Sequence, residues 1–231
     1  MLNNNINNNY NHPPSNNDST PISVLLPFKV ATINANSIID NSREQLVLDM
    51  MDHHHIQLCD LSETHLQSSQ AKHRLNNDPK YTAFFSSSSN FVKDKNSGVG
   101  IILTKHYARY VQSYKEYEGH ALHVDMYMRG HTKLRVIQLY SHASQINDNR
   151  KKIEELHAYV LKIIKEAQQK RFMIILMGDF NINYANFMEL YNRRHNVSNW
   201  RYRFLNDLKL LHLFDVMTLC HDINHRNPMN I

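Results

Sequence analysis

The chain has 231 residues, of which 42% are hydrophobic and 20% are charged, a composition typical of a globular domain rather than a disordered or fibrous protein. It carries 26 Lys and Arg against 21 Asp and Glu, a formal charge of +5 that permits a polyanionic partner without requiring one. Two cysteines are too few for a disulfide framework, and neither a signal peptide nor a long apolar run is present. We therefore expect an intracellular protein, nuclear or cytoplasmic, that is not secreted and does not enter a membrane.

The N-terminus differs in composition from the rest of the chain. Residues 1–21 are rich in Asn and contain too few apolar side chains to offset the entropy lost on ordering. We predict that they form a disordered tail without chemistry, and that residues 22–231 form one domain with a sizeable core. Nothing in the sequence indicates the oligomeric state.

The first half of the domain is predicted to consist mainly of strands. A strand at Lys29–Ile33 is followed by the capping-box pattern Ser42–Gln45, which predicts a helix to about His55. Strict alternation of apolar and polar residues predicts an antiparallel strand with one exposed face at Leu122–Met128. The remaining strands of this half are expected at Ile56–Leu61, Gly98–Leu103 and Leu134–Tyr140.

The second half begins with a long helix. Helical spacing of apolar residues predicts it over Ile153–Ala167, with Asn147 or Asn149 as its N-cap. The continuous apolar run Phe172–Met177 predicts a strand buried on both faces, and a later helix carries Phe204–Leu211. Strands outnumber helices, and hairpins mix with helical crossovers. We therefore predict an α/β (α+β) fold, a two-sheet β-sandwich flanked by helices in four layers, α/β/β/α.

Polar side chains stand at the ends of four predicted strands. Gly178 stops the long apolar strand, and Asp179 and Asn181 follow it two positions apart. One carboxylate and one carboxamide held rigidly suit phosphodiester hydrolysis, in which one group activates water and another holds a phosphate oxygen. Asparagine and aspartate are also common turn formers, and a tyrosine at a strand end is often a half-buried core residue. The other strand ends supply Asn34, Asn36, Glu63 and Tyr140.

The order of these motifs resembles the endonuclease/exonuclease/phosphatase superfamily. Asn-x-Asn is followed by Ser-Glu-Thr-His-Leu at 62–66, Ser-Gly-Val-Gly-Ile at 97–101, a strand-ending tyrosine, and Gly-Asp-Phe-Asn at 178–181. Within the superfamily, the chain is most similar to the apurinic-endonuclease-like domains of LINE-type retrotransposons, from about residue 28 onward. The resemblance implies the two-sheet sandwich, a Mg²⁺-dependent phosphodiester hydrolase of the DNA endonuclease type, and DNA as the partner.

The resemblance also implies a role for each candidate residue. Glu63 corresponds to the family's metal-binding glutamate, and Asn36 to the Asp or Asn on the metal side of the family's site, with Asn34 beside it. Mg²⁺ prefers oxygen ligands and retains waters, so one or two protein oxygens plus a substrate phosphate suffice, and Mn²⁺ is the alternative ion. The implied catalytic residues are Tyr140, which hydrogen-bonds the scissile phosphate, Asp179, which orients or deprotonates the attacking water, and Asn181, which steadies the phosphate.

The chain departs from the family's pattern in three places. Ser37 stands where the family usually has Gly after Asn-x-Asn. In the tyrosine motif, Gln138 and His142 stand where the family has Asn and Pro. At the C-terminus, the family's Arg-Ile-Asp-Tyr-like strand and Ser-Asp-His motif have no counterpart, and Asp222 and His225 receive no role. We therefore expect a domain that lacks its last strands, and an impaired enzyme. The alternatives are a lipid or nucleotide phosphatase of the same superfamily and a non-catalytic nucleic-acid-binding remnant.

Overall fold

The computed structural model describes residues 28–88, 97–142, 149–194 and 199–216. The tail predicted at residues 1–21 lies outside these residues, and so do Asp222 and His225. The predictions made for those segments therefore stay predictions.

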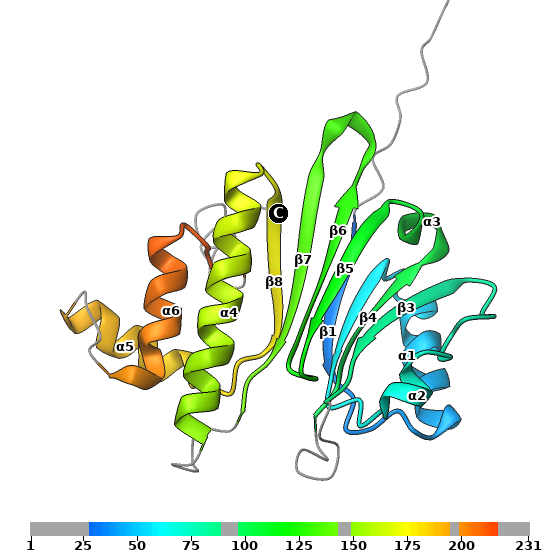
Figure 1. The fold of residues 1–231 in the computed structure, drawn as a ribbon, viewed down its shortest axis with the longest axis horizontal. Coiled ribbons are helices and arrows are strands. Elements are labelled where there is room, and N and C mark those ends of the chain that lie inside the picture. The colour runs from blue at the N-terminus through cyan, green and yellow to red at the C-terminus, as the bar shows by residue number, and fades with distance from the viewer. Residues whose placement is uncertain (1–27, 89–96, 143–148, 195–198, 217–231) are drawn as a thin grey trace, which may run out of the picture.

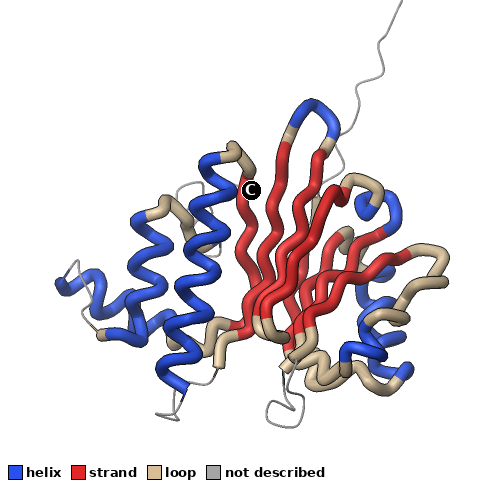
Figure 2. The backbone as a smooth tube through the Cα atoms, viewed as in Figure 1, coloured by secondary structure: helices blue, strands red, loops and turns tan. Residues whose placement is uncertain are grey.

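In the described part of the chain, eight strands form two four-stranded sheets that pack face to face (Figures 1 and 2). Apolar residues of both sheets, among them Ile101 and Val136, fill the space between them. This arrangement confirms the predicted sandwich. The first sheet has the order β1-β2-β4-β3, with β1 Val30–Asn34, β2 Leu58–Ser62, β3 Tyr81–Ser86 and β4 Val99–Thr104. The second has the order β5-β6-β7-β8, with β5 Val111–Tyr117, β6 Ala121–Tyr127, β7 Lys133–Tyr140 and β8 Met173–Asp179.

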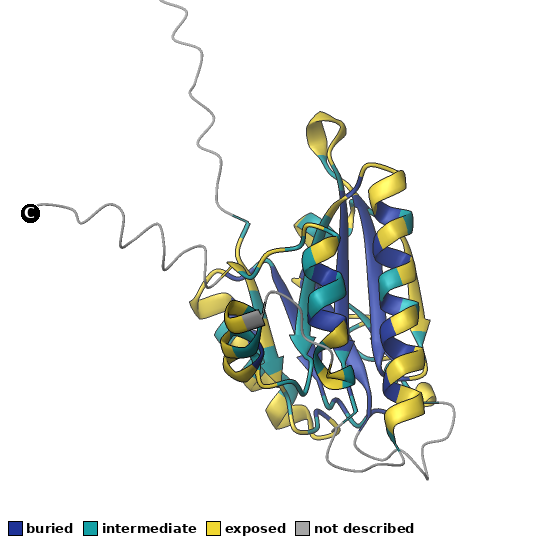
Figure 3. Cartoon of the chain, turned by 90° about the vertical axis from the view of Figure 1, so that its left-hand side faces the viewer, coloured by how far each residue is buried: buried dark blue, intermediate teal, exposed yellow. Residues whose placement is uncertain are grey.

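Helices cover the outer faces of the sheets and bury only their inward sides (Figures 1 and 3). α1, Asn41–His53, packs on the first sheet, whereas α4, Arg150–Gln169, and α6, Trp200–Leu210, pack on the second. Among the described helices, none combines the length and apolar character needed to cross a bilayer. The shorter elements are α2 Ser68–Ala71, α3 Lys105–Ala108, the 3-10 turn η1 Arg129–His131, and α5 Tyr184–Arg194.

Parallel pairing brings four strand ends to one edge of the sandwich. β1 runs parallel to β2, with Asn34 opposite Ser62, and β7 runs parallel to β8, with Tyr140 opposite Asp179. β1 and β8 also contact each other across the two sheets. Because parallel neighbours end on the same side, the residues that follow these four strands lie close together.

Two predicted strands differ from expectation in their burial. β6 is buried on both faces rather than half exposed, because α4 packs on the side that carries His123 and Asp125. Asp125 is tolerated there because Arg135 of β7 donates to both of its carboxylate oxygens, at 2.6 and 2.7 Å. β8 is only half-buried rather than enclosed on both faces, because it is the last strand of its sheet.

Helix boundaries also differ in detail from the predictions. The N-cap of α1 is Asp40 rather than Ser42, and its carboxylate accepts a hydrogen bond from the Ser42 amide at 3.0 Å. Of the two residues predicted as the N-cap of α4, Asn149 is the one found there, but its side chain makes no capping hydrogen bond. The strands β3 and β5 and the helix α5 were not predicted, although α5 has apolar residues that recur at helical spacing, namely Tyr184, Phe187, Met188 and Tyr191.

Gly178 allows β8 to approach β7 closely just before Asp179. Its φ is +120°, and a Cβ there would lie 2.0 Å from the Leu139 carbonyl oxygen. We expect Gly178→Ala to push the two strands apart and to lower the free energy of unfolding by roughly 3 kcal/mol or more. Urea-induced unfolding measures the loss.

Gly130→Ala is the matched control for this substitution. Gly130 also has a positive φ, +73°, but a Cβ there would meet no atom within 4 Å. The control therefore carries the backbone penalty alone, about 1–2 kcal/mol. Equal losses in the two variants would show that the close approach at Gly178 contributes nothing.

Candidate active site

The structure brings the six predicted site residues to the edge where β1, β2, β7 and β8 end. Glu63 lies at the centre of the group. Its Oε1 accepts one hydrogen bond from the Tyr140 hydroxyl and one from Asn34 Nδ2, each at 2.9 Å. Tyr140 belongs to the second sheet and Asn34 to the first, so the Glu63 carboxylate is bound from both sides.

Glu63 keeps its other oxygen outside this pair of hydrogen bonds. Oε2 lies 4.0 Å from His65 Nε2, and 22% of the Glu63 side chain is exposed. One carboxylate oxygen is therefore fixed by two hydrogen bonds, while the second lies near His65 in a side chain that is partly exposed. This division suits a carboxylate that is both held in place and able to contact a cation.

Asn34 and Asn36 are joined by a local hydrogen bond. The Asn36 amide donates to Asn34 Oδ1 at 3.0 Å, while Asn34 Nδ2 is bound to Glu63. Asn34 thus uses both ends of its carboxamide within the protein, whereas the Asn36 side chain is exposed beside it. The Asn36 carbonyl in turn accepts from the Arg43 guanidinium. Asn36 is therefore better placed than Asn34 to offer an oxygen to a metal ion.

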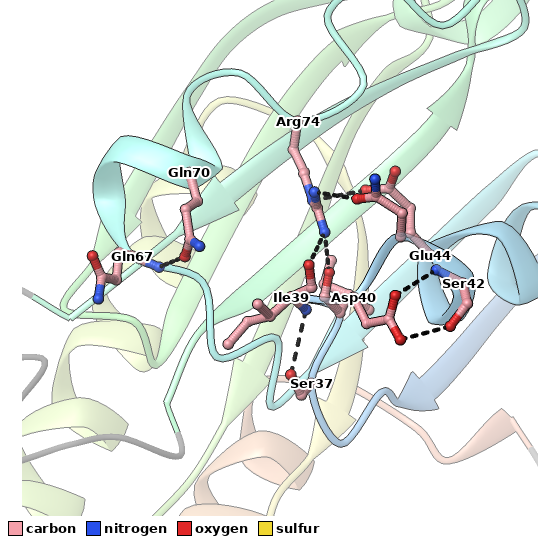
Figure 4. Close-up of polar contacts among 10 residues, drawn as sticks. Ser37, Ile39, Asp40, Ser42, Glu44, Gln67, Gln70 and Arg74 are labelled. Carbon is pink, nitrogen blue, oxygen red and sulfur yellow. Dashed lines mark hydrogen bonds and ion pairs between the residues drawn. The ribbon is translucent and has the colours of Figure 1, made fainter.

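Arg74 anchors the loop that follows Asn36 (Figure 4). Its guanidinium donates to the carbonyls of Ile38 and Ile39, the latter at 2.7 Å, and forms an ion pair with Glu44 at 3.0 Å. Burial raises the pKa of Glu44, and the positive charge of Arg74 opposes that shift. The loop from β1 to α1 is thus tied to the chain after α2, which fixes the position of Asn36.

Asp179 and Asn181 form the second half of the site. The Asn181 amide donates to Asp179 Oδ1 at 2.8 Å, and Asn181 Nδ2 donates to the Ser141 carbonyl at 2.5 Å. The Ser141 amide donates to the Asp179 carbonyl at 2.9 Å. These bonds connect the turn after β8 to the residue after Tyr140, so the two halves of the site share one backbone frame.

Three of the predicted site residues have left-handed backbone conformations. Asn36, Glu63 and Asn181 have φ values of 41°, 54° and 49°. Glu63 is unusual in this region, where Gly, Asn and Asp are the common residues. Such conformations persist only where the surrounding structure imposes them, and they are concentrated at functional sites.

The donor set fits a single hard cation with retained waters. Among the described residues, no group of three or more His, Cys, Asp and Glu side chains is placed to hold a metal ion. The available oxygens are Oε2 of Glu63 and the exposed carboxamide of Asn36. Mg²⁺ is commonly bound by one or two protein oxygens, waters and a substrate phosphate, and this site supplies that number.

Two histidines that were not predicted as site residues pack beside Tyr140. The buried His120 donates from Nδ1 to the Tyr140 carbonyl at 2.8 Å, and its ring stacks on the Tyr140 ring at 5.7 Å. The His142 ring lies 3.8 Å from that of His120. The replacement of Pro by His142 in the tyrosine motif was the available signal for this cluster.

A buried carboxyl group lies beneath the site. Asp60 is in the middle of β2, three residues before Glu63, and is fully buried. Neither of its oxygens has a hydrogen-bond partner among the described residues that meets ordinary geometric limits. Burial raises the pKa of Asp60 to about 7, and the Thr32 hydroxyl on the neighbouring strand opposes the shift.

Asp60 should therefore destabilise the fold as the pH rises. The pKa of Asp60 is about 7 in the folded chain, against an ordinary value of 3.8, so the penalty is absent near pH 4 and complete above pH 7. We expect Asp60→Asn to raise the free energy of unfolding above pH 7 by roughly 2–4 kcal/mol, with the gain vanishing near pH 4. Urea unfolding across this pH range measures the difference.

Asp125→Asn provides the matched control, since Asp125 is equally a buried aspartate on a central strand. It is paired with Arg135, so its substitution leaves a buried guanidinium without its carboxylate. We expect a loss of about 3 kcal/mol from this variant at neutral pH. A loss of stability in Asp60→Asn above pH 7 would contradict the assignment of Asp60 as an unpaired buried acid.

Comparisons with known proteins place this geometry in a known fold. No protein-family model matches the sequence, and no curated protein matches it. Solved structures do match. A 3′ phosphatase from Neisseria bound to a product DNA hairpin aligns with a TM-score of 0.57 and 19% identity, over 80% of this chain and 71% of that one. The Xenopus laevis APE2 catalytic domain aligns with a TM-score of 0.59 and 15% identity, over 78% and 67%.

An AP endonuclease from Archaeoglobus fulgidus aligns with a TM-score of 0.52 and 16% identity, over 80% of this chain and 71% of that one. At these identities the likeness shows the fold and not the activity. The chain therefore has the fold of the endonuclease/exonuclease/phosphatase superfamily.

Proposed function

We propose that this chain is a Mg²⁺-dependent phosphodiester hydrolase that cleaves DNA, and that it is an endonuclease domain of the retroelement type. The Glu63 carboxylate carries the proposal, because it accepts hydrogen bonds from Tyr140 of one sheet and Asn34 of the other. Asp179 lies beside this group, opposite Tyr140 in the pairing of β7 with β8. The shared fold supports the class of reaction. The motifs Ser-Glu-Thr-His-Leu and Gly-Asp-Phe-Asn support the retroelement type.

Glu63 and Asn36 would hold the metal, and Asn34 would keep both in position. Because Oε1 of Glu63 already accepts two hydrogen bonds, Oε2 is the oxygen that we assign to the cation. Bound there, Mg²⁺ supplies positive charge that stabilises the phosphoryl oxygens and the leaving oxygen.

The catalytic side chains would act on the water and the phosphate. Asp179 would orient the attacking water and take its proton as the water oxygen bonds to phosphorus and the bond from phosphorus to the leaving oxygen breaks. The Tyr140 hydroxyl donates its one proton to Glu63 in the structure. Once that carboxylate is neutralised by a cation, the hydroxyl would turn to donate to the scissile phosphate instead. Asn181 steadies the phosphate from the turn after β8. Asp179 and Asn181 are held by hydrogen bonds before substrate arrives, so only the Tyr140 hydroxyl changes its partner.

DNA is the substrate that the chain favours. The formal charge of +5 suits a polyanion, and one of the similar enzymes holds a DNA product. A strand phosphate would supply the remaining oxygen ligands of a metal site that has one carboxylate.

The test is nicking of supercoiled plasmid in Mg²⁺, with EDTA as the blank. We expect Glu63→Gln and Tyr140→Phe to reduce the nicking rate by about 10²-fold or more, because each removes a group that contacts the metal or the phosphate. Calorimetric Mn²⁺ titration of Glu63→Gln should show weakened metal binding, independently of turnover.

Matched controls lie on β5, at the far edge of the second sheet. Glu116→Gln and Tyr114→Phe make the same chemical changes at exposed positions and should nick at the normal rate. Nicking that survives in Glu63→Gln would overturn the proposal. Cleavage of a phosphomonoester without DNA nicking would identify a phosphatase, and DNA binding without cleavage would identify a non-catalytic remnant.

A further inference from the structure

A cavity of about 180 Å³ opens beside Asn181 on the helical side of the second sheet. Its walls come from the turns after β7 and β8 and from the start of α6, together with side chains of α4 and α5, among them Ile153 and Asn186. His142, Asn181, Trp200 and Arg201 all line it. The cavity therefore adjoins the candidate active site through Asn181 and extends away from Glu63 toward α6.

Trp200 is the residue that gives this cavity its chemistry. It is the first residue of α6, is half-buried, and is the single tryptophan of the chain. The guanidinium carbons of Arg150 and Arg201 lie 5.2 and 5.6 Å from the centre of its ring. The Trp200 ring and the Arg201 guanidinium thus meet at one wall of the cavity, and Arg150, which does not line it, contacts the same ring.

The positions of these groups are set by the fold. The Asn199 side chain accepts a hydrogen bond from the Arg201 amide at 3.1 Å, which fixes the start of α6. Arg150 also pairs with Glu154 at 3.0 Å, but both side chains are more than half exposed. An exposed ion pair of this kind contributes little stability, so a phosphate can replace the carboxylate as the partner of Arg150 at small cost.

We propose that this cavity binds an unpaired nucleotide of the DNA strand next to the scissile phosphate, with its base stacked on Trp200 and its phosphate bound by Arg150 and Arg201. That the bound nucleotide belongs to the cleaved DNA strand rests on the proposed function, whereas the ability of the cavity to bind a nucleotide does not. Aromatic rings beside guanidinium groups are the recurring way in which proteins bind single-stranded nucleic acid. A paired base is stacked inside its duplex and cannot offer its face to Trp200.

Fluorescence of the single tryptophan tests this directly in the unmodified chain. In EDTA, which prevents metal-dependent cleavage, a single-stranded oligonucleotide of about eight nucleotides should quench Trp200 in a saturable titration. A fully paired duplex should quench it far less. Equal quenching by both, or no quenching by either, would overturn the proposal.

Variants of α6 distinguish the contribution of base stacking to binding from that of non-specific attraction between charges. With a labelled oligonucleotide, Trp200→Ala should weaken binding roughly tenfold, and Trp200→Phe, which retains a ring, should weaken it less. Arg201→Gln should weaken binding and reduce the salt slope by about one. Arg203→Gln is the matched control, because Arg203 lies on the same helix, is exposed, and does not line the cavity. Equal losses in the two arginine variants would contradict a built subsite.

The outcomes also distinguish this proposal from the proposed function. Glu63-dependent nicking with an unresponsive Trp200 would sustain the enzyme and overturn the nucleotide cavity. Saturable quenching without nicking would sustain the cavity and overturn the enzyme. Thermal melting of Trp200→Ala and Trp200→Phe shows whether a weakened variant is still folded, and the quenching result stands without any variant.

Discussion

The two hydrogen bonds received by the Glu63 carboxylate connect the sheets at the candidate site, and the rest of the site depends on them. Asn34 ends a strand of the first sheet and Tyr140 ends a strand of the second. Gln138 adds a link nearby, because its Nε2 donates to the Leu61 carbonyl at 3.2 Å and to Ser62 Oγ at 3.1 Å. The carboxylate keeps its position only while the packing between the sheets keeps its register. Core packing therefore sets the geometry of a site built from strand ends.

Backbone strain at the site follows from the same constraint. Asn36, Glu63 and Asn181 each turn the chain sharply at the end of a strand, in a conformation that costs about 1–2 kcal/mol for residues other than glycine. The turns redirect polar side chains to the shared edge instead of into the sheet. Arg74 offsets part of that cost at the first turn by binding the loop carbonyls that follow it.

Much of this arrangement could be predicted, because it depends on the local sequence pattern of apolar and polar residues. Apolar runs that stop at polar pairs locate strand ends, and parallel pairing then brings Asn34, Glu63, Tyr140 and Asp179 to one edge. Features that depend on distant packing could not be predicted. Arg74 contacts a loop 35 residues earlier in the chain. The half-exposure of β8 depends on its place at the end of a sheet, which the apolar run Phe172–Met177 does not reveal.

The scarcity of carboxylates near the metal side has a consequence for substrate binding. Asn34 and Asn36 are neutral, so Glu63 is the one acidic residue among the three predicted metal-side residues. A cation held by one carboxylate and neutral oxygens is bound weakly until a phosphate completes its ligands. In the proposed enzyme, affinity for the strand must then come largely from contacts outside the metal site. The cavity at Trp200, which adjoins Asn181 and is flanked by two guanidinium groups, lies where a neighbouring nucleotide could supply it.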